Sequence, residues 1–538
     1  MKNNRLLWIF VLLFAVLMSI PWLVPHTGAL VLVGFIPLLL AEDIASQLRI
    51  KHFWWYHYAA FVLWNAATTF WVCNATIGGG IFAILANALQ MSVIFSLFRL
   101  SRKRLGGALP YIFLAVMWIA WERWYLQSAE ISWPWLVLGN AFAGSTRLVQ
   151  WYEFTGQLGG SLWVWAVNLT AYGLLVALAD GRQRRWTPFA SVCAAVGATL
   201  VIAGPVLLSH ALYNHYEEKS EGTVDVVIGQ PNFDPYEKFQ SMTQAQQDSV
   251  LLGMFGDAVP EGNSRHLMFL APETFTSSVV LSPEGPVSPS LDSYRTFLAD
   301  YPGSSMLVGA SSYEFINTRS KPSPLARQYG QGWIIGHNSA LMLEAEGSPE
   351  VFHKSKLVVG VEKTPYPKLF VPLDDWLCKV FHISSLMGRD CGQAELSCLS
   401  FGDVPLGCAV CYESVYGEYC TDYVRKGARA MTVITNDAWW GDTPGYRQHF
   451  NYSRLRAIEL RRDLARCGNT GISAFIDQRG DIVERGPWWE PAVLTGEINL
   501  SSARTFFVRY GDITGRVCTL CFLLLLGLLI VSLFVRIR

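Results

Sequence analysis

The sequence predicts two structural parts, a bundle of about eight transmembrane α-helices and an extracytoplasmic α/β domain. Three observations predict this organisation. The chain has 538 residues, which is too many for a single hydrophobic core. Hydrophobic residues make up 51% and charged residues only 16%, a composition too apolar for an ordinary soluble protein. Apolar runs near the bilayer-spanning length of about 20 residues surround one large polar block.

Eight apolar runs are predicted to cross the membrane, seven in a bundle over residues 1–210 and one in a terminal segment over 511–538. The first run follows Lys2 and Arg5, as in a signal peptide, but the stretch Pro21–Pro25 has no small-residue cleavage pattern. A retained helix is therefore expected there. The runs are 6–23, 30–40, 53–73, 79–98, 109–126, 160–179, 188–208 and 517–535.

Basic residues gather at every second end of these runs. Because Lys and Arg are enriched in cytoplasmic loops, those ends are predicted to be cytoplasmic, and residues 211–510 are then placed outside the cytoplasm. Such a compartment permits disulfides. The basic clusters are Lys2 and Arg5, then Arg49 and Lys51, then Arg99, Arg102, Lys103 and Arg104, then Arg182, Arg184 and Arg185, and finally Arg536 and Arg538.

Residues 211–510 alternate β-rich runs with helical patterns, which is typical of an α/β domain. The β-rich runs begin at 223, 266, 304, 332, 403, 431 and 471. The pattern RQHFNYSRLRAIELRRDLAR from 447 predicts a helix packed on a sheet. Lys+Arg and Asp+Glu are equal at 42 each, so no basic excess indicates a nucleic-acid partner.

Three reactive side chains end or follow separate β-rich runs of this block. Glu273 ends HLMFLAPE, Lys354 lies in EVFHKSKLVVGVE, and Cys411 ends VPLGCAVC. The segment after Cys411, YESVYGEYCTDYVRKGA, predicts a helix, whose N-terminal N–H groups would favour a thiolate. Each residue alone is more often ordinary than catalytic, and it is the combination that indicates nucleophilic chemistry.

Five other cysteines of the block are expected to have structural roles. In an extended strand Cys408 and Cys411 point to opposite faces, which disfavours a disulfide between them. No second C-x-x-C or H-x-H completes a zinc set, so no metal is predicted. We expect Cys408 in the core and a possible disulfide between Cys391 and Cys398 in a polar loop. The thiols of Cys420 and Cys467 are expected to be buried.

Several motifs resemble the nitrilase, or carbon–nitrogen hydrolase, superfamily, whose members use a Glu–Lys–Cys triad. These motifs are FLAPETF, FHKSKLVVGVE, AVCYES and ITNDAWWGD. With its helical prefix and its terminal helix, the whole chain resembles the bacterial apolipoprotein N-acyltransferases. Further segments fit that family: SWPWLVLGN, GQPNFDPYEKF, GYRQHFNYSRLRAIELRR, RCGNTGISAFIDQRG and TFFVRYGD. The resemblance implies an α-β-β-α sandwich for residues 211–510. It also implies a multi-pass monomer in the bacterial inner membrane, with the catalytic domain facing the periplasm.

The resemblance also implies site residues. Cys411 would be the nucleophile and Glu273 the general base, while Lys354 and the backbone N–H of Tyr412 would stabilise an oxyanion. Glu362 would orient Lys354 or the base. Glu413 would support the cysteine turn, although a structural ion pair is the alternative for both glutamates.

Aromatic residues form a second group of candidates, for substrate binding. They are Trp133 and Trp135 in the predicted loop 127–158, together with Phe239, Trp439 and Trp440. An aromatic belt at the membrane interface is the alternative for the loop tryptophans. The family commonly has Trp where this chain has Phe239, and Pro-Phe-Gly where it has Val359, Gly360 and Val361.

The implied reaction is an N-acyl transfer, the final step of lipoprotein maturation. An acyl chain would pass from a membrane phospholipid, through a Cys411 thioester, to the α-amino group of the diacylglyceryl-cysteine of an apolipoprotein. No cofactor is expected. The alternative enzyme is a membrane-anchored amidase or nitrilase that hydrolyses a small amide or nitrile. A transporter or scaffold is disfavoured because few ionisable residues lie within the spans, namely Glu42, Asp43, His57 and Glu122.

Overall fold

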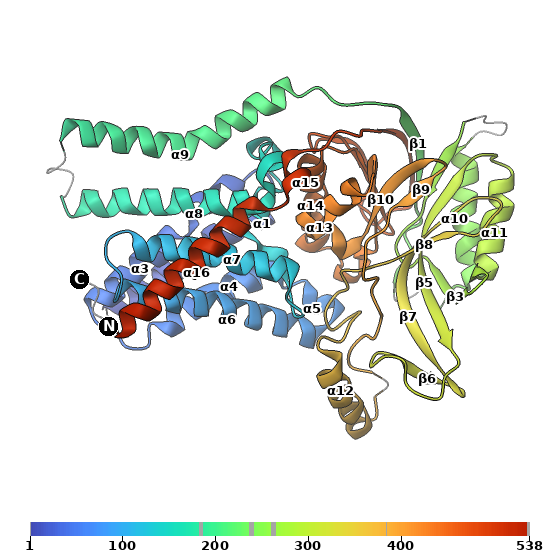
Figure 1. Ribbon diagram of the computed structural model, residues 1–538, viewed down its shortest axis with the longest axis horizontal. Helices are drawn as coiled ribbons and strands as arrows, with labels where there is room; N and C mark the ends of the chain where they lie inside the picture. Colours follow the sequence, from blue (N-terminus) through green and yellow to red (C-terminus); the bar gives the residue numbers. More distant parts are fainter. Residues whose placement is uncertain (1, 182–186, 236–240, 260–264, 384, 535–538) are drawn as a thin grey trace. The chain divides into compact units, whose positions relative to one another are not determined.

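The computed structural model describes residues 2–181, 187–235, 241–259, 265–383 and 385–534 (Figure 1). The described residues form two compact units. The helical unit draws on Met1–Ala129, Trp133–Tyr216 and Tyr510–Arg538, and the α/β unit on Glu130–Ser132 and Glu217–Arg509. Phe239 and five of the basic residues named above, Arg182, Arg184, Arg185, Arg536 and Arg538, lie outside the described residues.

Each predicted span is helical in the described residues of the helical unit. The main helices are α1 (Lys2–Leu23), α3 (Ile36–Gln47), α4 (Trp54–Thr69), α6 (Ile77–Arg102), α7 (Leu109–Gln127), α8 (Tyr152–Ala179), α9 (Pro188–His215) and α16 (Ile513–Phe534). Among the described residues, six stretches are long and apolar enough to cross a membrane, and the regions of α4 and α7 are not among them. The helix α4 has only 16 residues, and α7 carries Glu122 and Arg123. Eight spans therefore stay a prediction.

The predicted loop 127–158 is shorter in the structure. The helix α8 begins at Tyr152, and Gly156 interrupts it with a φ of 61°. This left-handed residue kinks the helix, so the apolar run from 160 covers only the part after the kink. Between α7 and α8 the chain makes short 3-10 turns, over Pro134–Leu136, Leu138–Phe142 and Thr146–Leu148.

The α/β unit contains two sheets. In the first, the strand order is β15-β1-β2-β5-β3-β4, and β7 joins β5 and carries β6 and β8. Its strands are β1 (Thr223–Gln230), β2 (Leu267–Leu270), β3 (Thr276–Ser282), β4 (Gly285–Val287), β5 (Ser305–Ile316), β6 (Arg327–Tyr329), β7 (Gly332–Leu343), β8 (Glu350–His353) and β15 (Ala492–Asn499). The second has the order β14-β13-β12-β11-β10-β9. Its strands are β9 (Leu399–Phe401), β10 (Val404–Val410), β11 (Ala430–Thr435), β12 (Leu464–Gly468), β13 (Ala474–Ile476) and β14 (Ile482–Arg485).

Strand alternation explains how the two sheets stack. In β1, Val226 and Ile228 enter a core shared with Cys408 and Val410 of the second sheet. Val227 points the other way, into a core with α10 (Gln244–Ala258) and α11 (Pro289–Ala299). The second sheet is covered on its far side by α13 (Gly417–Arg425) and α14 (Pro444–Leu460) (Figure 1). The predicted α-β-β-α sandwich is confirmed.

Two predicted helices differ from the structure. The helix from 447 begins earlier, at Pro444, and ends at Leu460, because Arg461 turns left-handed with a φ of 48°. Its predicted tail is instead β12, which pairs in parallel with β11. After Cys411 the chain forms a five-residue 3-10 turn, Cys411–Val415, before α13. A helical periodicity does not reveal where a left-handed residue ends the helix.

Candidate active site

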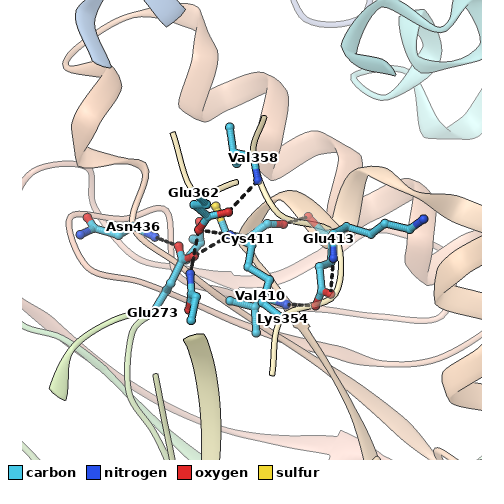
Figure 2. Close-up of polar contacts among 12 residues, drawn as sticks. Glu273, Lys354, Val358, Glu362, Val410, Cys411, Glu413 and Asn436 are labelled. Atoms are coloured by element: carbon cyan, nitrogen blue, oxygen red, sulfur yellow. Dashed lines mark hydrogen bonds and ion pairs between the residues drawn. The ribbon is translucent and has the colours of Figure 1, made fainter. Parts of the chain in front are cut away.

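The three predicted catalytic side chains meet at the ends of three strands. Glu273 follows β2, Lys354 follows β8, and Cys411 follows β10 of the other sheet. Figure 2 shows these side chains gathered with that of Glu362 in one place. The Lys354 Nζ lies 2.9 Å from Oε1 of Glu273 and 2.8 Å from Oε1 of Glu362. Stacking the two sheets therefore brings the thiol close to a lysine held between two carboxylates.

Lys354 is buried, with 1% of its side chain exposed. Burial lowers its pKa, but the carboxylates of Glu273 and Glu362 outweigh burial and raise the pKa of Lys354 well above its usual value. The lysine is therefore a permanent ammonium at neutral pH. Such a group stabilises developing negative charge but does not take up a proton.

Asn338 of β7 bridges the carboxylates of Glu273 and Glu362. This residue was not identified from the sequence. Its Nδ2 donates to Oε1 of Glu273 and to Oε1 of Glu362, at 2.8 Å in each case. The backbone N–H of Asn436 donates to Oε2 of Glu273 at 3.1 Å. A polar side chain inside the β-rich run from 332 was the available signal for Asn338. Asn436 lies within the quoted motif ITNDAWWGD.

Cys411 stands on a left-handed turn at the end of β10, with a φ of 51° and 8% of its surface exposed. Burial and the carboxylate of Glu273 raise the pKa of Cys411 well above its usual value, although Lys354 lowers it. Burial therefore favours the thiol, and the turn that begins at Cys411 is a short 3-10 helix instead of the longer helix that was predicted. The thiol needs a base, and Glu273 is the nearby candidate.

The carboxylate of Glu413 stabilises the turn at Cys411 by accepting hydrogen bonds. Its Oε1 accepts from the backbone N–H groups of Ser355 and Lys356, at 2.7 and 3.1 Å, and from the hydroxyl of Tyr419 at 2.7 Å. Its Oε2 accepts from the N–H of Val410 at 2.9 Å (Figure 2). One fully buried carboxylate thus ties the segment after Lys354 to the strand that ends at Cys411.

The other predicted site residues differ in burial and lie in different units of the structure. Tyr412 is buried beside Cys411, and its hydroxyl donates to the backbone oxygen of Ser132 at 3.4 Å. Trp440 packs against the core cluster that contains Cys408 and Cys411, whereas Trp439 is 37% exposed. Trp133 and Trp135 belong to the helical unit, where their rings stack at 5.2 Å. A role for these aromatic residues in substrate binding stays a prediction.

All eleven cysteines are free thiols, including Cys391 and Cys398, so the possible disulfide between these two is absent. Cys408, Cys420 and Cys467 are buried, as predicted.

One cluster has the donor types of a metal site. A carboxylate oxygen of Asp437, a ring nitrogen of His449 and the Cys411 sulfur lie within 4.8 Å of one another. The Asp437 carboxylate, however, is already paired with the guanidinium of Arg466 at 2.6 Å. The protein itself therefore supplies the cation that this carboxylate needs.

Comparisons with known proteins match both units. The family model "Apolipoprotein N-acyltransferase N-terminal domain" matches residues 7–170, and the model "Carbon-nitrogen hydrolase" matches 323–506. A Chlorobaculum tepidum protein named apolipoprotein N-acyltransferase is 28% identical, over 92% of this chain and 91% of that protein. Proteins of the same name from Geobacter metallireducens and Thermotoga maritima are 26% and 30% identical, over 95% and 47% of this chain and 93% and 49% of theirs.

Proposed function

Because this chain belongs to the apolipoprotein N-acyltransferase family, we propose that it N-acylates apolipoproteins through a thioester on Cys411. The donor is a membrane phospholipid, and the acceptor is the α-amino group of an N-terminal diacylglyceryl-cysteine. The observation that carries the assignment of residues is the buried ammonium of Lys354 between Glu273 and Glu362, beside the Cys411 thiol.

The first half-reaction acylates the enzyme. Oε1 of Glu273 already accepts two hydrogen bonds, whereas a single bond to Oε2 leaves that oxygen a lone pair for the thiol proton. The sulfur attacks the ester carbonyl carbon and a C–S bond forms. The ammonium of Lys354 and the N–H of Tyr412 stabilise the oxyanion, a contribution of about 3–4 kcal/mol per donor. The C–O bond then breaks, and Glu273 returns the proton to the departing lysophospholipid alkoxide.

The second half-reaction transfers the acyl chain to the amine. The α-amine attacks the thioester carbonyl, and Glu273 takes a proton from the nitrogen as the C–N bond forms. The C–S bond breaks, and the proton on Glu273 passes to the Cys411 sulfur. The products are an amide and a free thiol, so the enzyme returns to its resting state. Glu362 and Asn338 keep Lys354 and Glu273 in place throughout.

A lipid donor is supported by an exposed apolar helix of the α/β unit. The helix α12 (Pro367–Phe381) exposes Leu369, Leu373, Trp376 and Val380, which recur at the spacing of one helical face. Its opposite face buries Asp374, which pairs with Arg389 at 2.7 Å. Large apolar side chains exposed along one face are typical of a helix that lies in a lipid interface. A small soluble amide as substrate would leave this face unexplained.

The proposed location is the bacterial inner membrane, with the α/β unit in the periplasm. Within the helical unit, Glu42 and Asp43 of α3 pair with Arg99 and Arg102 of α6. The C-terminal half of α3 therefore contacts the end of α6. Each of these helix ends carries or precedes a basic cluster in the sequence, as the positive-inside rule expects for the cytoplasmic side. One chain carries every proposed catalytic side chain, so we propose that the protein acts as a monomer. We also propose that it uses no cofactor and binds no nucleic acid.

The decisive experiment is acyl transfer by the purified protein in detergent micelles. Phospholipid with a labelled acyl chain is supplied first, and mass spectrometry of the Cys411 peptide should show the added acyl mass. A diacylglyceryl lipopeptide is then added, and the label should move to its α-amino group. Release of free fatty acid without lipopeptide acylation would favour the hydrolase alternative. Absence of label on the Cys411 peptide would refute the proposed nucleophile.

A further inference from the structure

Buried polar side chains form hydrogen bonds to the carbonyl oxygen of the peptide that joins Cys411 to Tyr412. His449 of α14 places Nε2 3.0 Å from the carbonyl oxygen of Cys411. The hydroxyl of Ser414 donates to the same oxygen at 2.8 Å. A carbonyl oxygen only accepts, so the imidazole donates from Nε2. Both side chains are fully buried, so this carbonyl has two protein donors away from solvent.

His449 is itself held by a buried anion. Its Nδ1 lies 2.9 Å from Oδ1 of Asp437, and Arg466 pairs with the other carboxylate oxygen at 2.6 Å. Thr435 donates to Oδ1 of Asp437 at 2.6 Å. Burial raises the pKa of Asp437, but His449 and Arg466 outweigh burial and lower that pKa below its usual value. The carboxylate is thus a fixed negative anchor for the imidazole ring.

The peptide group between Cys411 and Tyr412 is planar and rigid. In a trans peptide the C=O and the N–H point in opposite directions within one plane. Fixing the Cys411 carbonyl from one side therefore fixes the direction of the Tyr412 N–H on the other side. A hydrogen bond to the carbonyl also polarises the amide and makes its N–H a stronger donor. Cys411 needs this support, since a residue with a Cβ rarely adopts a φ of 51°.

We propose that His449 is a positioning residue for acyl transfer, acting through the 411–412 peptide on the N–H that stabilises the oxyanion. The inference rests on the proposed function, because that function assigns the Tyr412 N–H to the oxyanion. Asp437 and Arg466 hold the ring, and Ser414 provides a second hydrogen bond to the same carbonyl. None of these side chains needs to touch substrate.

The test compares two reactions of the same thiol in the purified full-length protein. Alkylation by iodoacetamide requires a reactive, accessible Cys411 but forms no oxyanion, whereas acylation by labelled phospholipid forms one. His449→Asn removes the donor at the Nε2 position, and His449→Gln extends an amide N–H to it. We expect His449→Asn to slow acylation at least tenfold, with the roughly 10²–10³-fold loss that removing an oxyanion donor causes as the upper limit. Its alkylation rate should stay within about threefold of wild type, and His449→Gln should recover part of the acylation.

Equal losses in both reactions would mean that His449 merely maintains the fold, which overturns the proposal, as would wild-type acylation by His449→Asn. If His449→Asn does not fold, Ser414→Ala removes the other donor to the same carbonyl. It should slow acylation while sparing alkylation, and equal effects on both reactions would again overturn the proposal. Wild-type protein that never carries label on Cys411 would instead refute the proposed function, so the two failures are distinguishable.

Discussion

The ammonium nitrogen of Lys354 lies 2.9 Å from Oε1 of Glu273, with 1% and 7% of these two side chains exposed. Lys354 and Glu273 follow strands of the same sheet, and Cys411 follows a strand of the other. A buried ion pair is costly to break, because removal of one partner leaves an unpaired buried charge. Substitutions here should therefore affect both chemistry and folding, so activity and thermal unfolding must be measured together.

Cys411 should be the only essential cysteine in the stretch from 408 to 420. Cys411→Ala should abolish protein-bound acyl label and all turnover, because no other group holds the acyl chain between half-reactions. Cys411→Ser should accept an acyl group but stall, since an oxyester acylates an amine poorly. The matched controls are Cys408→Ala and Cys420→Ala, at buried positions of the same core. They should cost about 1–2 kcal/mol of stability and retain the label. Loss of label in Cys408→Ala with retention in Cys411→Ala would reverse the assignment.

Lys354→Arg should be nearly as damaging as Lys354→Ala. The ammonium fits between two carboxylates at 2.9 and 2.8 Å in a fully buried site, where a forked guanidinium is too large. Both variants should lose about 10²-fold or more in the acylation rate. Single-turnover acylation measures this effect, and thermal unfolding in detergent serves as the control for folding. Near-normal activity of the arginine variant would reduce Lys354 to a general positive charge.

Glu362→Gln and Glu413→Gln should separate chemistry from support. The Glu362 side chain is 15% exposed and contacts the Lys354 ammonium, so its amide variant should lose activity with little change in melting temperature. Glu413 is fully buried and accepts from several backbone N–H groups, which an amide NH₂ cannot replace. Its variant should also lose about 1–3 kcal/mol of stability. If Glu362→Gln destabilises the protein as strongly, Glu362 is a structural partner of Lys354.

Alkaline pH should reveal the buried thiol of Cys408. Burial raises the pKa of Cys408 to about 12, whereas the pKa of an unfolded cysteine is about 8.5. The folded pKa is the higher one, so this contribution to stability is complete below the unfolded pKa and decreases as pH rises above it. Between pH 8 and 10, wild type should lose about 1–2 kcal/mol more than Cys408→Ala. Melting temperatures of both proteins across this range test the sign, and parallel curves would contradict it.

Residues of the α/β unit should be accessible from the periplasm. Tyr329 is 62% exposed on β6, so Tyr329→Cys should react with a membrane-impermeant maleimide in cells whose outer membrane is permeabilised. Lys103→Cys, in a predicted cytoplasmic loop, should react only after the inner membrane is disrupted. Labelling is measured as the gain over the parent protein. The opposite pattern would invert the proposed topology.

Much of this protein could be predicted from local sequence patterns. Apolar runs, their basic flanks and the alternating block after 211 indicated helices and an α/β domain, because burial leaves a periodic trace in the sequence. The three reactive residues were found because each ends or follows a β-rich run within a quotable motif. The motif around Cys411 did not reveal the burial that raises the pKa of its thiol.

The tertiary structure alone decided which side chains meet. Asn338 bridges Glu273 and Glu362, and His449 reaches the carbonyl of Cys411, only because two sheets stack and α14 packs on one of them. Periodicity reports that a position is buried, but it does not report which distant residue lies opposite, since that depends on sheet register and stacking. The raised pKa of Cys411 has the same origin, because desolvation is set by all the elements that surround a group rather than by its neighbours in sequence.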